Sequence, residues 1–172
     1  MTHKMIFCSF PDDAIAEAVL LKLQGAGFSS DQVSVIFPER GKVKNYVLEK
    51  HSKAPEGAAA GGGTGGVIGG ILGWLVGIGS LAIPGVGPFI AAGPILAALS
   101  GSALGAAVGG LIGSLVGMGV SEVEAKKYEQ KLKEGHVLIA AHAKNAEEVQ
   151  KARQIFTDSG GRDLTETSEL AA

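Results

Sequence analysis

The chain has 172 residues, a formal net charge of -2 and a single cysteine, Cys8. This length predicts one compact domain with an additional segment rather than several domains. One cysteine excludes an internal disulfide, and the near-neutral charge gives no electrostatic reason to expect nucleic acid as a partner. We expect no signal peptide, because the opening residues are polar and the apolar run after them is short.

The first forty residues predict a strand, a helix and a second strand. Residues 5–10 (MIFCSF) are a short apolar run, which is typical of a buried strand. Asp12 then caps a helix whose apolar positions follow the helical period until Gly25 ends it. Residues 32–37 predict the second strand. The mixed and partly basic residues 40–56 lead into the next region.

Residues 57–120 carry no charged side chain, in a chain of which 19% of the residues are charged. Two glycine rows, each with a period of four, run through this region, and a shift of forty positions superimposes them. The rows consist of Gly61, Gly65, Gly69, Gly73 and Gly77, and of Gly101, Gly105, Gly109, Gly113 and Gly117. Residues four apart share one helix face, so each row forms a groove that a second backbone can approach. These glycines are the predicted packing residues of a glycine-zipper α-helical hairpin.

Such helices are favoured in hydrocarbon rather than in water. In water each interior glycine costs a helix about 1 kcal/mol relative to alanine, whereas in a bilayer an unpaired backbone amide costs more. Residues 58–82 and 89–119 each supply the roughly 20 apolar residues that a membrane span needs. Leu75 and Leu111 lie opposite the glycines and are predicted to face lipid or a partner. A soluble oligomer that buries the hairpin between subunits is the alternative.

Residues 81–100 bridge the two glycine rows. They are apolar, but Pro84, Pro88 and Pro94 interrupt them. Proline has no N–H group and favours the first turn of a helix. We therefore expect a kinked second helix from Phe89 onward, or a short buried helix before the second glycine row.

The chain after the apolar region repeats the pattern of its beginning. Ser121 begins a helix, with Glu124 as the second member of a capping box. Residues 136–143 then predict a strand, residues 146–159 a helix and residues 162–167 a weak last strand.

Without the apolar region, these elements form a split βαβ pair, the pattern of a ferredoxin-like α+β domain. Residues 1–56 supply the first half and a basic connector, residues 57–120 the hairpin, and residues 121–172 a helix and the second half. The two halves must meet in one sheet, so both ends of the hairpin must lie on the same side of any membrane. Removing residues 57–120 and joining the ends is then expected to leave a folded soluble domain.

Lysines flank both ends of the apolar region. Lys50 and Lys53 precede it, and Lys126 and Lys127 follow it. By the positive-inside rule, this places both soluble halves in the cytoplasm, at the inner membrane. The later lysines also alternate with glutamates at helical spacing, which is typical of a solvated helix face and also suits anionic lipid headgroups.

The order of these features resembles a known group of proteins. The βαβ unit, the segments GGGTGG and GGILGWL, the bridge AIPGVGPFIAAGPILAAL and the later helix EAKKYEQKLKEG are similar to bacterial general stress proteins of the 17M-like group. Low-temperature-induced proteins share a similar pattern. The resemblance covers nearly the whole chain, and the bridge is its most specific part. It implies a stress-linked, membrane-associated protein with no assigned reaction and transfers no catalytic residue.

We predict no catalytic, cofactor or metal site. Residues 61–66 match the dinucleotide fingerprint literally, but no strand precedes them and no acidic residue follows about 20 positions later. His136 and His142 share one face of a strand and Cys8 lies on a nearby strand, which makes a metal site a minor alternative to ordinary histidines.

We therefore interpret the chain as a non-enzymatic, membrane-associated stress protein whose hairpin inserts and self-associates. Its expected partners are the lipid bilayer and further copies of itself. A soluble homo-oligomeric shell or ring is the alternative from another class. A small-ligand sensor is the third, with the sheet binding the ligand and the hairpin as its output. The number of subunits, any ligand and the inducing stress stay open at this point.

Overall fold

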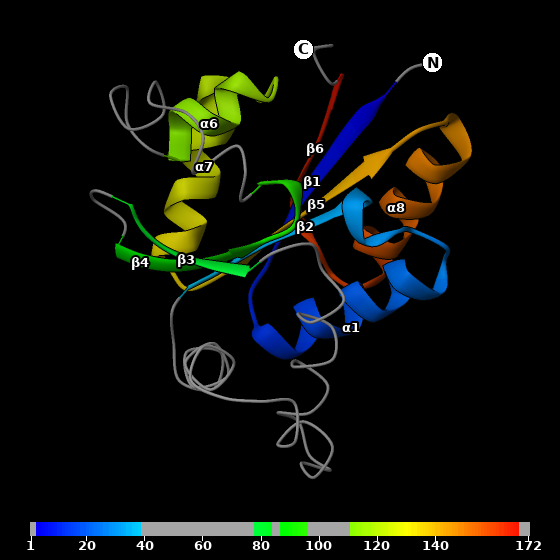
Figure 1. Ribbon diagram of the computed structural model, residues 1–172, viewed down its shortest axis with the longest axis horizontal. Helices are drawn as coiled ribbons and strands as arrows, with labels where there is room; N and C mark the ends of the chain where they lie inside the picture. The colour runs from blue at the N-terminus through cyan, green and yellow to red at the C-terminus, as the bar shows by residue number, and fades with distance from the viewer. Residues whose placement is uncertain (1–2, 39–77, 84–86, 96–110, 169–172) are drawn as a thin grey trace, which may run out of the picture.

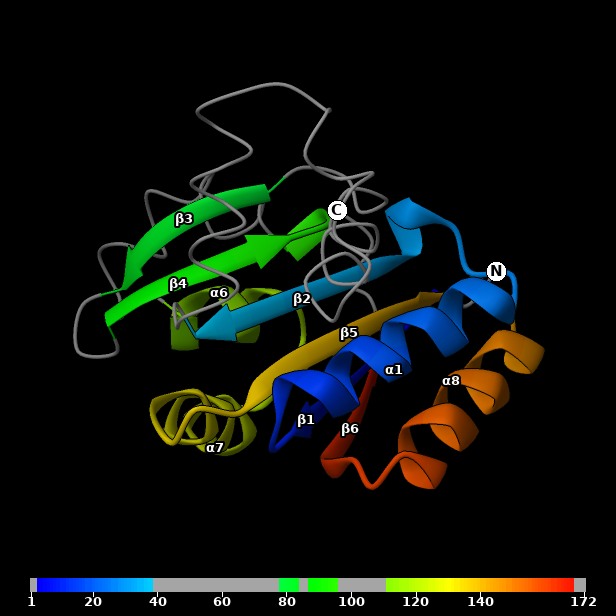
Figure 2. The same cartoon turned by 90° about the horizontal axis from the view of Figure 1, so that it is seen from below.

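The computed structural model describes residues 3–38, 78–83, 87–95 and 111–168 (Figure 1). Within these ranges the chain forms a six-stranded antiparallel sheet in the order β3-β4-β2-β5-β1-β6 (Figure 2). The strands are β1 (Lys4–Phe10), β2 (Val33–Pro38), β3 (Ile78–Ile83), β4 (Gly87–Ala92), β5 (Val137–Ala143) and β6 (Arg162–Ser168). The helices are α1 (Asp13–Gly25), α6 (Leu111–Gly117), α7 (Glu122–Lys133) and α8 (Ala146–Asp158), with a 3-10 turn, η1 (Ser30–Gln32). The fold is therefore α+β.

Strands from both ends of the chain build this one sheet. β5 lies between β1 and β2, with Ile139 opposite Cys8 on one side and opposite Val35 on the other. β6 pairs with the outer side of β1. The parts of the chain before and after the apolar region are therefore one folded body, as the order of the elements predicts.

The helix boundaries follow the capping residues. The Asp12 carboxylate accepts the N–H groups of Ala14 and Ile15, at 2.6 and 3.2 Å, and begins α1. The Ser121 hydroxyl accepts the N–H of Glu124 at 3.3 Å and begins α7. Asn145 caps α8 in the same way. The predicted starts of the helices at Asp12 and Ser121 are therefore confirmed, since a cap depends on local sequence, whereas the Asn145 cap was not predicted.

The bridge between the glycine rows differs from its prediction. Residues 78–83 and 87–92 are strands rather than helices, and Ala92 pairs with Ile78 on one side and with Val35 on the other. The predicted helix from Phe89 onward is therefore wrong, and neither residues 58–82 nor 89–119 form one continuous helix. The alternative was a short buried helix before the second glycine row, and most of that stretch, residues 96–100, lies outside the described residues. The free edge of β2 explains the difference, because it offers the backbone of β4 a complete ladder of hydrogen bonds.

Most of the predicted glycine-zipper hairpin belongs to residues that the structure does not describe. Residues 57–77 and 96–110, with eight of the ten predicted packing glycines, lie outside the described residues. Among the helices that the structure does describe, none has the length and the apolar composition of a membrane span.

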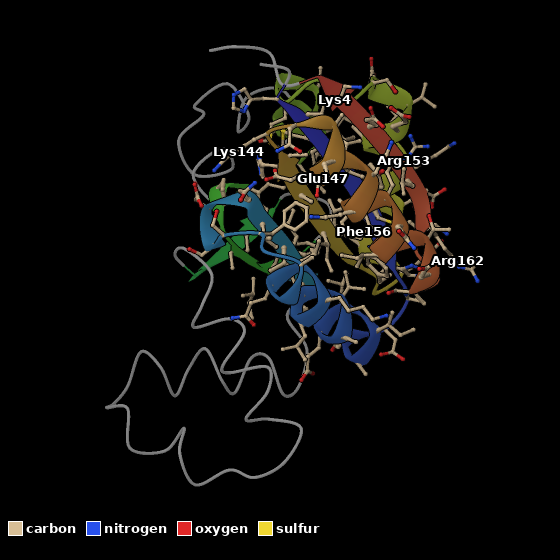
Figure 3. The ribbon with its side chains drawn as sticks, turned by 90° about the vertical axis from the view of Figure 1, so that its right-hand side faces the viewer. Lys4, Lys144, Glu147, Arg153, Phe156 and Arg162 are labelled. Atoms are coloured by element: carbon tan, nitrogen blue, oxygen red, sulfur yellow. The ribbon has the colours of Figure 1, made fainter. Side chains whose placement is uncertain are left out.

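Helices cover both faces of the sheet (Figure 1). On one face, which we call the first core, α1 and α8 pack on alternate residues of β1, β2 and β5. Phe10 and Phe156 meet there edge to face, with ring centroids 5.7 Å apart. Figure 3 looks onto this side and shows Arg153 and Arg162 along the outer margin of α8, near β6.

On the opposite face, which we call the second core, α6 and α7 pack on the remaining residues of the same strands. Tyr128 of α7 is its largest buried side chain, and its ring lies 6.1 Å from that of Phe7. Burial on both faces explains why β1, β2 and β5 are almost continuously apolar instead of alternating with polar residues.

Candidate functional site: the junction between the insert and the sheet

We call residues 57–120 the insert, and its described part joins the sheet at β2. After β4, the chain turns at Gly93 and passes close over the start of β2. Gly93 has φ +89°, and a Cβ at this position would lie 2.2 Å from the carbonyl oxygen of Val33. Both the positive φ and the close approach require glycine here. The turn brings Ile95 onto the second core.

A buried serine ties this turn to both halves of the domain. The Ser34 hydroxyl in β2 accepts the N–H of Ile95 at 3.1 Å and lies 3.3 Å from Nε2 of His142 in β5. Ser34 has no exposed surface, so a missing partner would leave a desolvated polar group. One hydroxyl therefore links the insert, the first half and the second half.

A second polar group, in η1, lies just before the start of β2. The Gln32 side-chain amide donates to the carbonyl oxygen of His142 at 3.0 Å and to the carboxylate of Glu148 at 2.8 Å. The same carboxylate accepts the N–H of Lys144, also at 2.8 Å. These bonds fix the start of α8 against η1 and β5, and they hold the two halves together next to the junction.

The insert reaches the second core through α6. Leu111, Ser114 and Leu115 are buried in this helix, whereas Gly117 is exposed and a Cβ there would meet no atom within 4 Å. Gly113 is half-buried. Within α6 the leucine row is the packing face, although this row was expected to face lipid or a partner. For the eight glycines outside the described residues, the packing role stays a prediction.

The predicted membrane-flanking lysines lie in two places. Lys50 and Lys53 are outside the described residues. Lys126 and Lys127 are exposed on α7. The Lys126 ammonium lies 2.9 Å from the carboxylate of Glu122, an exposed pair of the kind that contributes little to stability.

A small polar cleft separates α7 from the start of β6. It holds about 100 Å³ and is lined by Glu124, Lys127, Tyr128, Asp163, Leu164 and Thr165. The Thr165 hydroxyl donates to Glu124 at 3.3 Å, and the Tyr128 hydroxyl donates to the carbonyl oxygen of Asp163. These bonds use the polar groups of the cleft to attach α7 to β6.

The buried weak acids are held in their neutral forms. Burial raises the pKa of the Cys8 thiol to about 12, with a smaller contribution from the nearby Asp163 carboxylate. Burial also raises the pKa of the Tyr128 hydroxyl well above its usual value. A protonated thiol is a poor nucleophile and a poor metal ligand, so neither group is activated for chemistry.

The structure does not bring the histidines and Cys8 together. Cys8 belongs to the first core, whereas the alternation along β5 places His142 on the opposite face. His136 precedes β5, and its Nε2 atom lies 3.9 Å from the Glu134 carboxylate. No cluster of three metal-ligating side chains occurs in the described ranges.

Sequence reasoning missed the polar residues of the junction. Ser34 stands between two valines in an apolar strand, and a polar residue at such a position needs a buried partner. Gly93 next to Pro94 was a turn signal in the bridge. Both signals were present in the sequence, but the residues that Ser34 and Gly93 contact lie far away along the chain.

Comparison with protein families, with curated proteins and with solved structures finds no match to this chain.

Proposed function

We propose that this chain is a non-enzymatic, membrane-associated protein of the bacterial stress response that self-associates through its insert. The resemblance to general stress proteins of the 17M-like group supplies the link to stress. The charge-free sequence of residues 57–120 suggests membrane association, and one structural observation constrains its form. The strands before and after the charge-free region share one sheet, with β5 hydrogen-bonded to both β1 and β2.

This sheet constrains any contact with a bilayer. Because both ends of the insert belong to one folded body, a segment that enters the membrane must return to the side from which it came. The lysines at both ends, Lys50 and Lys53 before it and Lys126 and Lys127 after it, favour the cytoplasmic side of the inner membrane.

The strands limit which residues remain for the bilayer. β3, β4 and α6 take part in the sheet and the second core, so the charge-free segments that we propose for the bilayer are residues 57–77 and 96–110, which lie outside the described residues. Residues 57–77 have about the length of a span of 20 residues, whereas 96–110 are shorter. Residues 39–77 run between β2 and β3, and residues 96–110 lie between β4 and α6, so each stretch returns to the same body. Insertion that returns without a full crossing is therefore the form that we propose.

The body that carries the insert is proposed to be a ferredoxin-like domain. Its four strands β6-β1-β5-β2, with α1 and α8 on one face, follow the order of two interlocked βαβ units. In this proposal β3 and β4 extend that sheet beyond β2, and α6 with α7 cover the face that the four-stranded unit leaves open.

A soluble homo-oligomer is the second candidate, and the strands of the insert favour it. β3 and β4 continue the sheet and present a charge-free strand at its border (Figure 2). Subunits joined at this border would bury apolar insert residues between them without lipid.

Alkaline carbonate washing of lysed cells tests the proposal. We expect the protein to stay in the membrane pellet, and a Leu75→Asp variant to be released because a carboxylate is costly in hydrocarbon. Leu21→Asp is the matched control, since Leu21 is 44% exposed on α1, and should stay in the pellet. Release of the unaltered protein as a discrete oligomer without detergent would favour the soluble assembly.

A further inference from the structure

The two borders of the sheet are built differently. At one border, β6 carries Arg162, Asp163 and Glu166, and its register with β1 shifts between Phe7 and Ser9. Asp163 sits at this irregularity with φ 54°. Charges and a bulge on a border strand prevent other strands from adding to it. This border is protected.

The other border, β3, has none of these features. Its sequence, IGSLAI, contains no charge and no proline, and its six residues pair with β4 in one uninterrupted register. No strand among the described residues pairs with its outer side. Long, regular and apolar border strands are the sites at which sheets join another strand.

The proline in β4 shows which groups of β3 point outward. Pro88 lies opposite Ala82 and has no N–H, so these two residues cannot form the pair that exchanges two hydrogen bonds. Because such pairs alternate, Gly79 and Leu81 bond to β4. Ser80 and its neighbours two positions away, Ile78 and Ala82, then direct their N–H and C=O groups away from it.

We propose that β3 is the self-association surface, and that a second copy of this chain adds its own β3 in antiparallel orientation about a twofold axis. The inference deepens the self-association in the proposed function and depends on it. An antiparallel strand of identical sequence is complementary to itself. With Ser80 opposite Ser80, Ile78 of each copy pairs with Ala82 of the other, and every outward group finds a partner.

The absence of charge favours a second copy of this chain as the partner that pairs with β3. Residues 57–120 carry no charge, so two inserts meet without repulsion. A foreign peptide would find no charged side chain on β3 to select it, whereas a copy of the same chain continues a sheet in which every existing ladder is antiparallel.

Two Ser80 variants of the full chain test the surface by molar mass, measured by light scattering in the same buffer or detergent. Ser80→Pro removes one outward N–H without removing a bond to β4, and its particle should have about half the mass of the unaltered protein. Ser80→Thr keeps the N–H and suits a strand, so it should keep the full mass. The thermal unfolding transition of both variants shows whether the domain is still folded.

Cysteine cross-linking gives a second measurement that does not depend on proline. Opposite residues of a hydrogen-bonded pair have Cα atoms about 5.5 Å apart, within the range of a disulfide. Ser80→Cys should therefore form a disulfide between copies under mild oxidation. Ala82→Cys lies opposite Ile78 of the other copy, four residues from its equivalent, and should not. The unaltered chain, with only the buried Cys8, controls for other cross-links.

The outcomes separate this inference from the proposed function. A monomer under every condition overturns both the surface and self-association. If Ser80→Pro keeps the full mass and Ser80→Cys does not cross-link, the surface is wrong. If Gly69→Leu and Gly109→Leu then lower the mass, self-association stands and the glycine rows carry it. Attachment to the membrane is read separately in the carbonate wash.

Discussion

The two hydrophobic cores, on opposite faces of one sheet, draw on different parts of the chain. The first core, under α1 and α8, consists of residues from the two βαβ halves, with Ile90 and Ala92 as the insert's contribution. The second core, under α6 and α7, takes a large share from the insert. Its insert residues are Phe89, Ala91, Ile95, Leu111, Leu115 and Val120.

This difference shows that the insert is part of the domain and not an appendage to it. Ile36, Phe7 and Tyr128 are buried in the same cluster as these insert residues. A loose insert would expose this apolar face. The attachment of the insert and the stability of the domain are therefore linked, whereas the first core can form almost without it.

The largest effect is expected from deletion of the insert. Replacing residues 57–120 by a short Gly/Ser linker removes six buried residues of the second core and both added strands. We expect loss of the cooperative unfolding transition in calorimetry, which revises the expectation from the sequence that this product folds. Replacing residues 57–77 alone removes no described core residue and should keep the transition. If both deletions keep the cooperative transition, or both lose it, the insert does not stabilise the domain through the second core in the way described.

Truncation of one large side chain in each core compares them directly. Phe156→Ala in the first core is expected to lower the free energy of unfolding by about 3–5 kcal/mol, and Leu115→Ala in the second by about 2–5 kcal/mol. Val116→Ala is the matched control for α6, because Val116 is 42% exposed and should change stability by about 0.5 kcal/mol or less. Urea denaturation measures all three. A Leu115→Ala effect as small as the control would mean that α6 does not hold the second core together.

A pair of glycine substitutions separates the effect of the close backbone approach at the junction from the effect of a positive φ. Gly93 and Gly27 have similar dihedrals, φ +89° and +96°, but a Cβ meets backbone atoms of Val33 and Ser34 only at Gly93. Gly27→Ala should cost about 1–2 kcal/mol from its left-handed backbone. Gly93→Ala should cost more, because β4 must also move away from β2. Equal changes in urea midpoint would show that the close approach is unimportant.

The sequence predicts correctly those elements whose stabilising contacts lie close together along the chain. The helices begun by Asp12 and Ser121 are predictable, because a cap and the helical period lie within a few residues of each other. β3 and β4 are not, because short apolar runs fit a strand or a helix equally well. The pairing of Ala92 with Val35, fifty-seven positions away, decides between them. Ser34 was missed for the same reason, since its partners Ile95 and His142 are distant in sequence.

The smallest expected effect is a loss of folding stability at alkaline pH. Each core contains one titratable group that causes such a loss. Cys8 lies in the first core with its pKa raised from 9.0 to about 12, and Tyr128 lies in the second with its pKa raised above 10.0. In the unfolded chain both groups release their protons near the lower values. The folded state then binds more protons, so its stability is fully present below about pH 9 and falls as the pH rises.

Removing the groups one at a time separates the two cores in this titration. Between pH 9 and 10 the Cys8 thiol contributes a loss of at most about 1.4 kcal/mol, which Cys8→Ala should abolish. Above pH 10 the Tyr128 hydroxyl adds its own loss, which Tyr128→Phe should abolish without changing the slope at lower pH. Urea denaturation at intervals from pH 8 to 11 measures both slopes. If Cys8→Ala leaves the slope between pH 9 and 10 unchanged, the thiol is accessible to water, and the first core is less tightly closed than the second.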